Sequence, residues 1–491
     1  MKYRVRPPVR WQTYVLVYVA IALFMLLAHG PILDVPFYWD ETGQFIPAAL
    51  DLYQTGAAVP HSTLPNVHPP GLMAYLAVFW HVFGYSVTGT RAAMLLMASF
   101  AVLFTFLLAI ELGRDAPGAP ALTALAMLCV SPLFFAQSML AQLDMPAMCF
   151  SVLALLLFLQ DRFRASALAC VALVLMKETG LALVILAAVW LVLEKRHGGA
   201  RWYALPAVAL ALWLVALRVA TGHWMGNAEF TQYNLYYPLN PLRLTLALLR
   251  RAYYLFLGSG HFIGTAVLVW AWRRMPLFRS RPWRVAGAFV ALHTVLVCAL
   301  GGAVLERYLL PVLPVLYIAF AVALRALLPR TRQWALAALL VCLVAANFIN
   351  PVYPFPYENN LAFVSFTELE KEAAAAVELR SGVIATTFPM SDALQRPEFG
   401  YVSLPRKVVE LKSFRAGDVE KLKDPRPDMM LVYDTAWDPL RLLESTPAQW
   451  ILRKFYGFER ALTARETAKL LSMKIARQWE YRGMKMTLLV R

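Results

Sequence analysis

The chain has 491 residues, of which 60% are hydrophobic and 15% are charged, and its mean hydropathy is +0.56. This composition excludes a fully soluble protein and is typical of a chain that lies mostly in a lipid bilayer. The formal net charge of +16 does not indicate nucleic-acid binding, because the Lys and Arg residues before Pro351 cluster in short loops between hydrophobic segments. That distribution is typical of membrane proteins, whose basic loops stay in the cytoplasm.

The cysteines predict no disulfide framework. None of them falls in the long outer loops or in the polar C-terminal part, and cysteine in an apolar stretch behaves as a small hydrophobic residue. The five cysteines, all in such stretches, are Cys129, Cys149, Cys170, Cys298 and Cys342.

The first hydrophobic segment runs from about Trp11 to Leu33. It is too long for the core of a signal peptide and lacks a small-residue cleavage site, so we expect a retained spanning helix. Arg4, Arg6 and Arg10 precede it and are expected in the cytoplasm.

A long outer segment follows this helix and contains a second apolar stretch, Pro69 to Phe83. This stretch is short and opens with two prolines, so we expect one or two helices that lie at the membrane interface and do not cross.

Allowing about 20 residues for each crossing, we expect eleven spanning helices in a mostly α-helical bundle. With the N-terminus in the cytoplasm, this odd number places the part after Pro351 on the outer side. After the first helix, the expected bounds are about Ser86–Leu112, Ala121–Gln137, Met145–Gln160, Trp202–Ala220 and Trp334–Asn350. Helix pairs are expected to turn outside at Met176–Thr179 and Glu306–Tyr308. An outer loop is expected from Thr221 to about Arg251, before an eighth helix that ends at Arg273–Arg274.

The composition changes at Pro351, which divides the chain into a transmembrane domain over residues 1–350 and a small soluble α/β domain over residues 351–491. Helical and strand patterns alternate in the second part. Expected helices are Phe366–Leu379, Asp418–Leu422 and Glu466–Trp479, and expected strands are Gly382–Thr387, Met429–Asp434 and Met484–Val490.

The acidic residues of the bundle fall into two groups, one expected on the cytoplasmic side of the membrane and one on the outer side. Those at cytoplasmic helix ends stand beside Arg or Lys and are expected to be solvated boundary charges: Glu111, Asp115, Asp161 and Glu194. Others lie at or near tight outer turns between apolar segments, where carboxylates from several helices are expected to converge on a cavity. These are Asp40, Asp144, Glu178 and Glu306.

Basic residues share that outer level, against the usual distribution of Lys and Arg. An anionic ligand such as a phosphate would explain them. Pairing with neighbouring acids, as in Lys177–Glu178 and Glu306–Arg307, explains them equally well. The residues are Arg91, Lys177, Arg243, Arg250, Arg251 and Arg307.

Several motifs in this order resemble those of the C-type (GT-C) glycosyltransferases, and most of all the branch with protein O-mannosyltransferases and lipid A aminoarabinose transferases. The resemblance covers roughly Trp11 to Leu193, with a weaker match near Arg307. The motifs are Phe37–Thr42 (FYWDET), His68–Gly71 (HPPG), Ser131–Phe134 (SPLF), Leu140–Pro146 (LAQLDMP), Met176–Glu178 (MKE) and Glu306–Pro311 (ERYLLP).

The resemblance implies a membrane enzyme that transfers a sugar from a polyprenyl-phosphate donor to an acceptor on the outer face. Asp40 would be the base that deprotonates the acceptor, with support from Glu41, and Asp144 would be the second carboxylate. Donor phosphate would be bound by Lys177, Arg307, His68 and Arg91, and Tyr308 and Glu178 would contact substrate.

The chemistry requires no metal or other cofactor, because Lys and Arg can neutralise the leaving phosphate. A divalent-metal site made by Asp40 with His61 or His68 stays open as an alternative. The sequence does not identify the sugar, nor decide whether the acceptor is a protein, a lipid or a wall glycan. A bacterial inner membrane and an undecaprenyl carrier fit the Ala-, Leu- and Arg-rich composition.

The main alternative function is a transporter or lipid flippase whose outer charges belong to a substrate pathway. Such proteins often contain paired half-repeats with broken helices near the midplane, and this sequence shows no such repeat. Two aromatic-polar stretches, Asn227–Tyr237 and Tyr433–Asp438, fit either contacts with substrate or an ordinary interface and turn.

Overall fold

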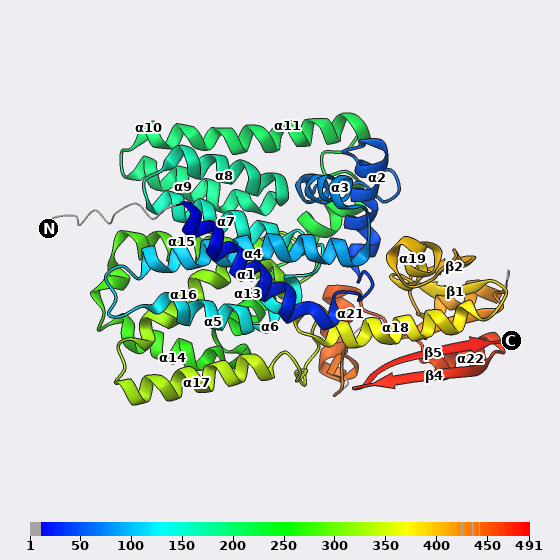
Figure 1. Ribbon diagram of the computed structural model, residues 1–491. Helices are drawn as coiled ribbons and strands as arrows, with labels where there is room; N and C mark the ends of the chain where they lie inside the picture. Colours follow the sequence, from blue (N-terminus) through cyan, green and yellow to red (C-terminus); the bar gives the residue numbers. More distant parts are fainter. Residues whose placement is uncertain (1–10, 424–425, 435–436, 441) are drawn as a thin grey trace.

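The computed structural model describes residues 11–423, 426–434, 437–440 and 442–491. Arg4, Arg6 and Arg10, which were expected in the cytoplasm, lie outside the described residues. The described chain is mostly helical: a long bundle is followed by a small sheet with its own helices, which extends from one end of the bundle (Figure 1). We call this the sheet end of the bundle.

Each segment expected to cross the membrane contains a helix. Among the described residues, six stretches are long and apolar enough to span a membrane: 11–32, 87–112, 197–221, 241–272, 281–299 and 306–324. The bundle helices are α1 (Trp11–His29), α4 (Val87–Leu112), α5 (Pro120–Val130), α6 (Pro132–Gln137), α7 (Asp144–Leu159), α8 (Phe163–Met176), α9 (Leu181–Leu193), α10 (His197–Ala200), α11 (Ala204–Thr221), α14 (His261–Trp272), α15 (Arg281–Ala299), α16 (Leu313–Leu324) and α17 (Pro329–Ala345).

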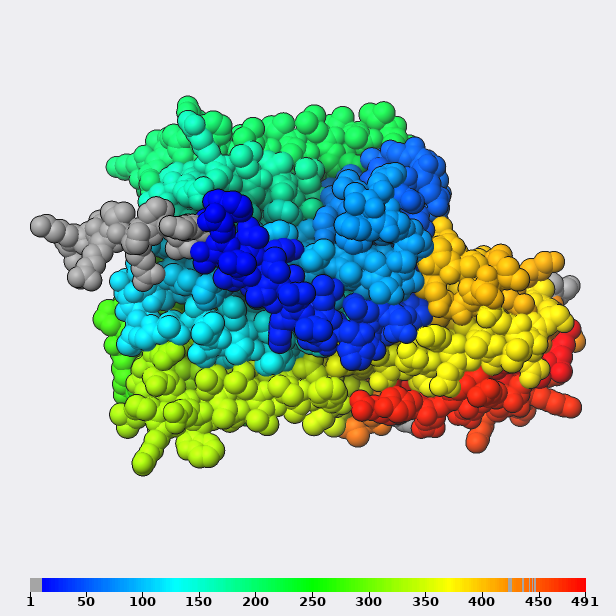
Figure 2. Space-filling model, viewed as in Figure 1, coloured from blue at the N-terminus to red at the C-terminus, as the bar shows by residue number. Residues whose placement is uncertain are grey.

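The core of the bundle is built from helices that are apolar on every side. All twelve residues of α16 are buried, as expected for a helix without a polar face. Helices at the rim expose large apolar side chains instead, such as Leu27, Leu193 and Val219, which are 78%, 75% and 81% exposed. Figure 2 shows α1 lying across the outside of the bundle. This exposed apolar surface is suited to lipid.

The ends of α4, α7 and α9 and the start of α15 lie at the end of the bundle away from the sheet (Figure 1). Acidic residues expected at cytoplasmic helix ends pair there with arginines: Arg114–Glu111 at 2.8 Å, Arg196–Asp161 at 2.7 Å and Arg281–Glu194 at 2.7 Å. These contacts hold the loops of several helices together at one level.

The sheet end carries short elements between the spanning helices. The interfacial stretch forms a single helix, α3 (Gly71–Phe83), preceded by a π-helical turn, η2 (Glu41–Phe45), and by α2 (Ile46–Thr55), which the sequence did not predict. The loop expected up to about Arg251 already contains a helix, α13 (Pro241–Phe256). Its start is capped by the Asn240 side chain, which accepts hydrogen bonds from the backbone N–H groups of Leu242 and Arg243.

The C-terminal part contains a five-stranded sheet in the order β2-β1-β3-β5-β4. β1 pairs in parallel with β2 and β3, and β5 pairs antiparallel with β3 and β4. Its elements are α18 (Ala362–Glu378), β1 (Ile384–Thr387), α19 (Met390–Gln395), β2 (Val408–Leu411), α20 (Ala416–Val419), β3 (Met429–Tyr433), α21 (Thr446–Tyr456), α22 (Ala464–Leu471), β4 (Lys474–Tyr481) and β5 (Met484–Val490).

The three strands expected from the sequence are β1, β3 and β5, whereas the helix expected over Glu466–Trp479 is wrong in its second half. α22 ends at Leu471, and Ser472 takes a left-handed conformation with φ of 54°. The chain then forms β4, which pairs along its length with β5. Pairing with a neighbouring strand overrides the local helical pattern.

The C-terminal part packs on the loop that follows α1. The backbone N–H of Phe37 donates to the carbonyl of Phe399 at 3.2 Å, and the hydroxyl of Tyr401 donates to the carbonyl of Phe37 at 2.8 Å. The rings of Trp39 and Phe388 meet edge to face, with centroids 5.5 Å apart. The first loop is therefore held between the bundle and the sheet.

Candidate active site

A cavity of about 760 Å³ lies at the sheet end, between the first loop, the start of α7, the turn η9 (Glu306–Val312) that precedes α16, and the segment that follows α17. Aromatic and amide side chains make up much of its wall, including Trp39, Asn66, Phe230, Tyr233 and Trp437. Its charged lining residues are Asp40, Asp144, Lys177, Glu229, Arg250, Arg307 and Glu358.

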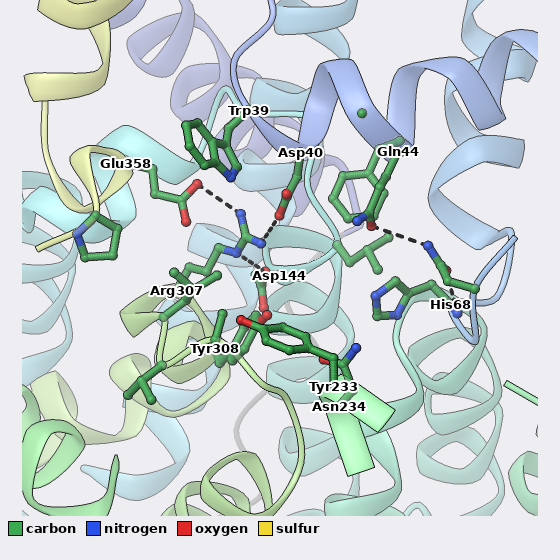
Figure 3. A pocket seen from close by; sticks show the side chains of 18 of the residues that line it. Trp39, Asp40, Gln44, His68, Asp144, Tyr233, Asn234, Arg307, Tyr308 and Glu358 are labelled. Carbon is green, nitrogen blue, oxygen red and sulfur yellow. Dashed lines mark hydrogen bonds and ion pairs between the residues drawn. The ribbon is translucent and has the colours of Figure 1, made fainter. Parts of the chain in front are cut away.

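Arg307 lies at the centre of the charged part and contacts three carboxylates (Figure 3). Its Nη1 donates to Oε2 of Glu358 at 2.9 Å, its Nη2 donates to Oδ2 of Asp40, and its Nε lies 3.3 Å from Oδ2 of Asp144. These three acids come from the segment after α17, the first loop and the start of α7. We call them the carboxylate cluster.

Lys177 is the second cation of the site. Its Nζ lies 2.5 Å from Oδ1 of Asp144 and 4.1 Å from the centre of the Tyr308 ring. α8 ends at Met176, so Lys177 has an extended backbone before the short turn η3 (Glu178–Gly180). This break in the helix turns the side chain toward Asp144, which thereby contacts both cations.

Asp40 and Glu41 are neighbours in sequence but lie in different surroundings. Trp39 has a left-handed backbone with φ of 48°, a strained conformation for a bulky residue. Asp40 lines the cavity, whereas Glu41 is fully buried. Oε2 of Glu41 accepts a hydrogen bond from the backbone N–H of Tyr38 at 2.8 Å, and Oε1 accepts one from that of Ala141 at 2.5 Å.

Arg91 is the partner of Glu41 and is not part of the cavity wall. Its Nη1 lies 2.5 Å from Oε1 of Glu41, and both side chains have no exposed surface. The guanidinium also donates to the carbonyls of Pro36 at 2.8 Å and Met139 at 3.1 Å. The structure therefore does not bring Arg91 or Glu41 to the cavity where the sequence analysis expected them.

His68 lines the cavity and pairs with Glu178, which lies behind it. Nδ1 of His68 and Oε2 of Glu178 are 2.9 Å apart. Glu178 is therefore engaged by His68 and not by its neighbour Lys177, and Glu306 is engaged by Arg250 at 2.5 Å and not by Arg307. The pairings expected between sequence neighbours are replaced by pairings between helices.

The two histidines considered as metal ligands with Asp40 are engaged elsewhere. Nδ1 of His61 lies 3.0 Å from Oδ1 of Asp51, and His68 pairs with Glu178. In the part of the chain that the structure describes, no group of three or more His, Cys, Asp or Glu side chains is placed to hold a metal ion.

Glu358 is the site residue that the sequence analysis missed. It lies in the turn η10 (Tyr357–Asn359), and besides Arg307 it accepts a hydrogen bond from Nε2 of Gln142 at 3.0 Å. Burial raises the pKa of Glu358 to about 7, although Arg307 acts in the opposite direction. The available signal was a lone carboxylate at the end of the Pro- and aromatic-rich segment that follows the last apolar helix.

The other basic residues of the outer level do not face the cavity, apart from Arg250. Arg243 donates to the carbonyls of Tyr237 and Phe455, each at 2.5 Å, and Arg251 is buried with Nη1 3.5 Å from Sγ of Cys298. Only part of the two aromatic-polar stretches reaches the cavity. Tyr433 is a buried residue of β3, whereas the lining includes Asn227, Tyr233, Asn234 and Trp437.

No protein-family model and no curated protein matches this chain. Solved structures match it over nearly the whole length. The crystal structure of ArnT from Cupriavidus metallidurans bound to undecaprenyl phosphate superposes with a TM-score of 0.57 at 16% identity, covering 97% of this chain and 98% of that chain. The chain has a GT-C fold.

Two further structures agree with this fold. ArnT from Cupriavidus metallidurans in the apo state gives a TM-score of 0.55 at 15% identity, again covering 97% of this chain and 98% of that chain. The oligosaccharyltransferase of Archaeoglobus fulgidus in complex with Zn and sulfate gives 0.51 at 12% identity, covering 84% of this chain and 67% of that chain. The GT-C architecture expected from the sequence motifs is thus confirmed at the level of the fold.

Proposed function

We propose that the protein is a membrane glycosyltransferase that takes a sugar from a polyprenyl-phosphate donor and gives it to an acceptor on the outer face of the membrane. The observation that carries the proposal is the cavity at the end of an apolar bundle that is lined by Asp40, Arg307 and Lys177, with Asp40 paired to Arg307. In the shared fold, the ArnT structure is bound to undecaprenyl phosphate.

The site contains the groups that such a transfer needs. The acceptor hydroxyl attacks the anomeric carbon of the donor and gives its proton to the carboxylate of Asp40. The bond between that carbon and the phosphate oxygen breaks, and polyprenyl phosphate leaves with the electron pair. Arg307 and Lys177 stabilise the negative charge that develops on this leaving group. Asp144 contacts both cations and fixes their separation.

The remaining predicted residues take roles that follow from their contacts. His68 lines the cavity, where a ring held by Glu178 is placed to contact donor or sugar. Tyr308 packs under Lys177 and supports its position. Glu41 and Arg91 are proposed as positioning residues, because their buried pair fixes the turn that presents Asp40.

We place the protein in the inner membrane of a bacterium, with eleven helices crossing and the sheet on the periplasmic side. The ion pairs and arginine-rich loops at the far end of the bundle support a cytoplasmic position for that end. The carrier is then undecaprenyl phosphate, and no metal or other cofactor is required. The sugar is a hexose or a pentose, and the acceptor is a protein, a lipid or a wall glycan.

The test uses purified protein in detergent with a panel of radiolabelled polyprenyl-phosphate sugars and a crude envelope fraction as acceptor. Release of free polyprenyl phosphate is followed for the wild type and for Asp40→Asn. Loss of a general base is expected to lower turnover at least about a hundredfold. The matched control is Asp34→Asn, which removes an exposed carboxylate of the same loop outside the cavity lining and is expected to leave turnover unchanged.

Equal turnover by the wild type and Asp40→Asn would remove Asp40 as the base. If the lipids bind but no donor turns over with the whole panel, the transporter or flippase alternative gains support over transfer.

A further inference from the structure

The charges of the cavity pose a problem for a phosphate ligand. The carboxylate cluster sets three acids against two cations, Arg307 and Lys177. The other cationic side chain of the lining, Arg250, pairs with Glu306. With the three acids ionised, the carboxylate cluster and the two cations together carry a net negative charge. Every nitrogen of the Arg307 guanidinium then faces a carboxylate. A phosphate group would bring further negative charge to cations that are already engaged.

One acid of the cluster is better placed than the others to give up its charge. Asp40 has to be ionised to act as the base. Asp144 is held by Lys177 at 2.5 Å as well as by Arg307. Glu358 is held by Arg307 and by an uncharged amide, that of Gln142. It also lies on the short turn between the bundle and the sheet, so its side chain can move without displacing a spanning helix.

We propose that Glu358 is a positioning residue that admits the donor phosphate to Arg307 only as the neutral acid. This inference rests on the proposed function. In its ionised form Glu358 keeps Nη1 of Arg307 and repels the phosphate. In its neutral form it releases that nitrogen, and its O–H can donate a hydrogen bond to a phosphate oxygen. Binding of the lipid phosphate is therefore coupled to the uptake of one proton.

The surroundings of Glu358 support a neutral form near physiological pH. Burial raises its pKa to about 7 against the opposing effect of Arg307, and Asp40 and Asp144 add to the increase. Tyr38 of the first loop also faces this carboxyl: burial and then the charge of Glu358 raise the pKa of the Tyr38 hydroxyl.

The helices packed against η10 add no cation to this carboxyl. α6 presents the amide of Gln137, which donates to the Glu358 carbonyl at 3.1 Å. The carboxyl of Glu370 in α18 turns instead to the hydroxyl of Tyr401, at 3.0 Å. Glu358 is therefore neutral below about pH 7 and ionised above it, so affinity for the lipid falls as the pH rises.

The experiment measures the dissociation constant of undecaprenyl phosphate between pH 6 and pH 8 for the full-length protein in detergent. A single proton with a pKa of about 7 predicts that wild-type affinity falls about tenfold more over this range than that of Glu358→Gln. The lipid phosphate titrates in the same range, but it does so equally with both proteins. The difference between them isolates Glu358.

A matched control is Asp392→Asn. Asp392 lies in α19, outside the cavity lining, and burial raises its pKa to about 6, so this variant removes another titrating acid and is expected to keep the wild-type pH dependence. A second measurement is calorimetry in buffers of different ionisation enthalpy: at pH 7.5, binding to the wild type should take up about one proton more than binding to Glu358→Gln.

The outcomes separate this inference from the proposed function. If the lipid binds with the same pH dependence, or with the same proton uptake, to wild type and Glu358→Gln, Glu358 does not control access and the inference is wrong while the function stands. If the lipid binds to neither protein at any pH, the proposed function is wrong and the inference with it.

Discussion

At the scale of the residue, the buried pair of Arg91 and Glu41 can be used to test whether Arg91 stabilises the fold or binds the donor phosphate. Arg91→Met leaves the Glu41 carboxylate buried without its counter-ion, which is expected to cost about 3–5 kcal/mol of stability. The midpoint of thermal unfolding in detergent should fall, and the double variant with Glu41→Gln should recover part of the loss. If Arg91→Met instead weakened lipid binding with no loss of stability, Arg91 would be a phosphate ligand after all.

The same scale shows what the sequence can predict about the site. Asp40, Asp144, Lys177 and Arg307 could be chosen because charged residues are scarce in an apolar bundle and these share one membrane level. The ion-pair partners of these residues could not be predicted from the sequence. Oppositely charged neighbours in the sequence suggest an ion pair, but Lys177 pairs with Asp144 of another helix. Glu358 was missed because its role depends on where the chain goes after the last span.

At the scale of the element, the contact between α3 and α8 is expected to control the position of Lys177. A Cβ atom added to Gly71, at the start of α3, would lie 2.4 Å from the carbonyl oxygen of Leu175 and 3.0 Å from Sδ of Met176. Backbone at the end of α8 would have to shift, at a cost of about 1–3 kcal/mol.

Gly71→Ala should therefore lower both thermal stability and donor turnover. The matched control is Gly287→Ala in α15, where an added Cβ meets nothing within 4 Å and alanine has the better helix propensity. Unchanged turnover in Gly71→Ala would show that this contact does not position the lysine.

The sequence pattern predicts spanning helices better than it predicts strands or helices within loops, for a physical reason. A spanning helix satisfies its own backbone hydrogen bonds, so an apolar segment of the right length is enough to predict it. β4 depends on a partner strand, and the local pattern over Glu466–Trp479 fits a helix until β5 is present beside it. The helix α13 inside an expected loop was signalled only by its cap, Asn240–Pro241.

At the scale of the whole molecule, the bundle and the sheet form the site together. The bundle supplies Asp144, Lys177 and Arg307, and the segment that leads to the sheet supplies Glu358. The first loop, which carries Asp40, is held on its other side by Phe399 and Tyr401. The sequence predicted both parts but not this contact, because no local pattern encodes how two folded units pack.

The orientation of this assembly in the membrane can be tested by labelling single cysteines. Leu404→Cys places a thiol on a side chain of the C-terminal part that is 70% exposed, and His197→Cys places one at the exposed start of α10, at the arginine-rich end. In spheroplasts, a membrane-impermeant maleimide should react with Leu404→Cys at once and with His197→Cys only after the membrane is permeabilised. Wild-type protein gives the background from the native cysteines, which lie in apolar helices. The reverse pattern would place the carboxylate cluster in the cytoplasm, where a sugar nucleotide could replace the lipid-linked donor.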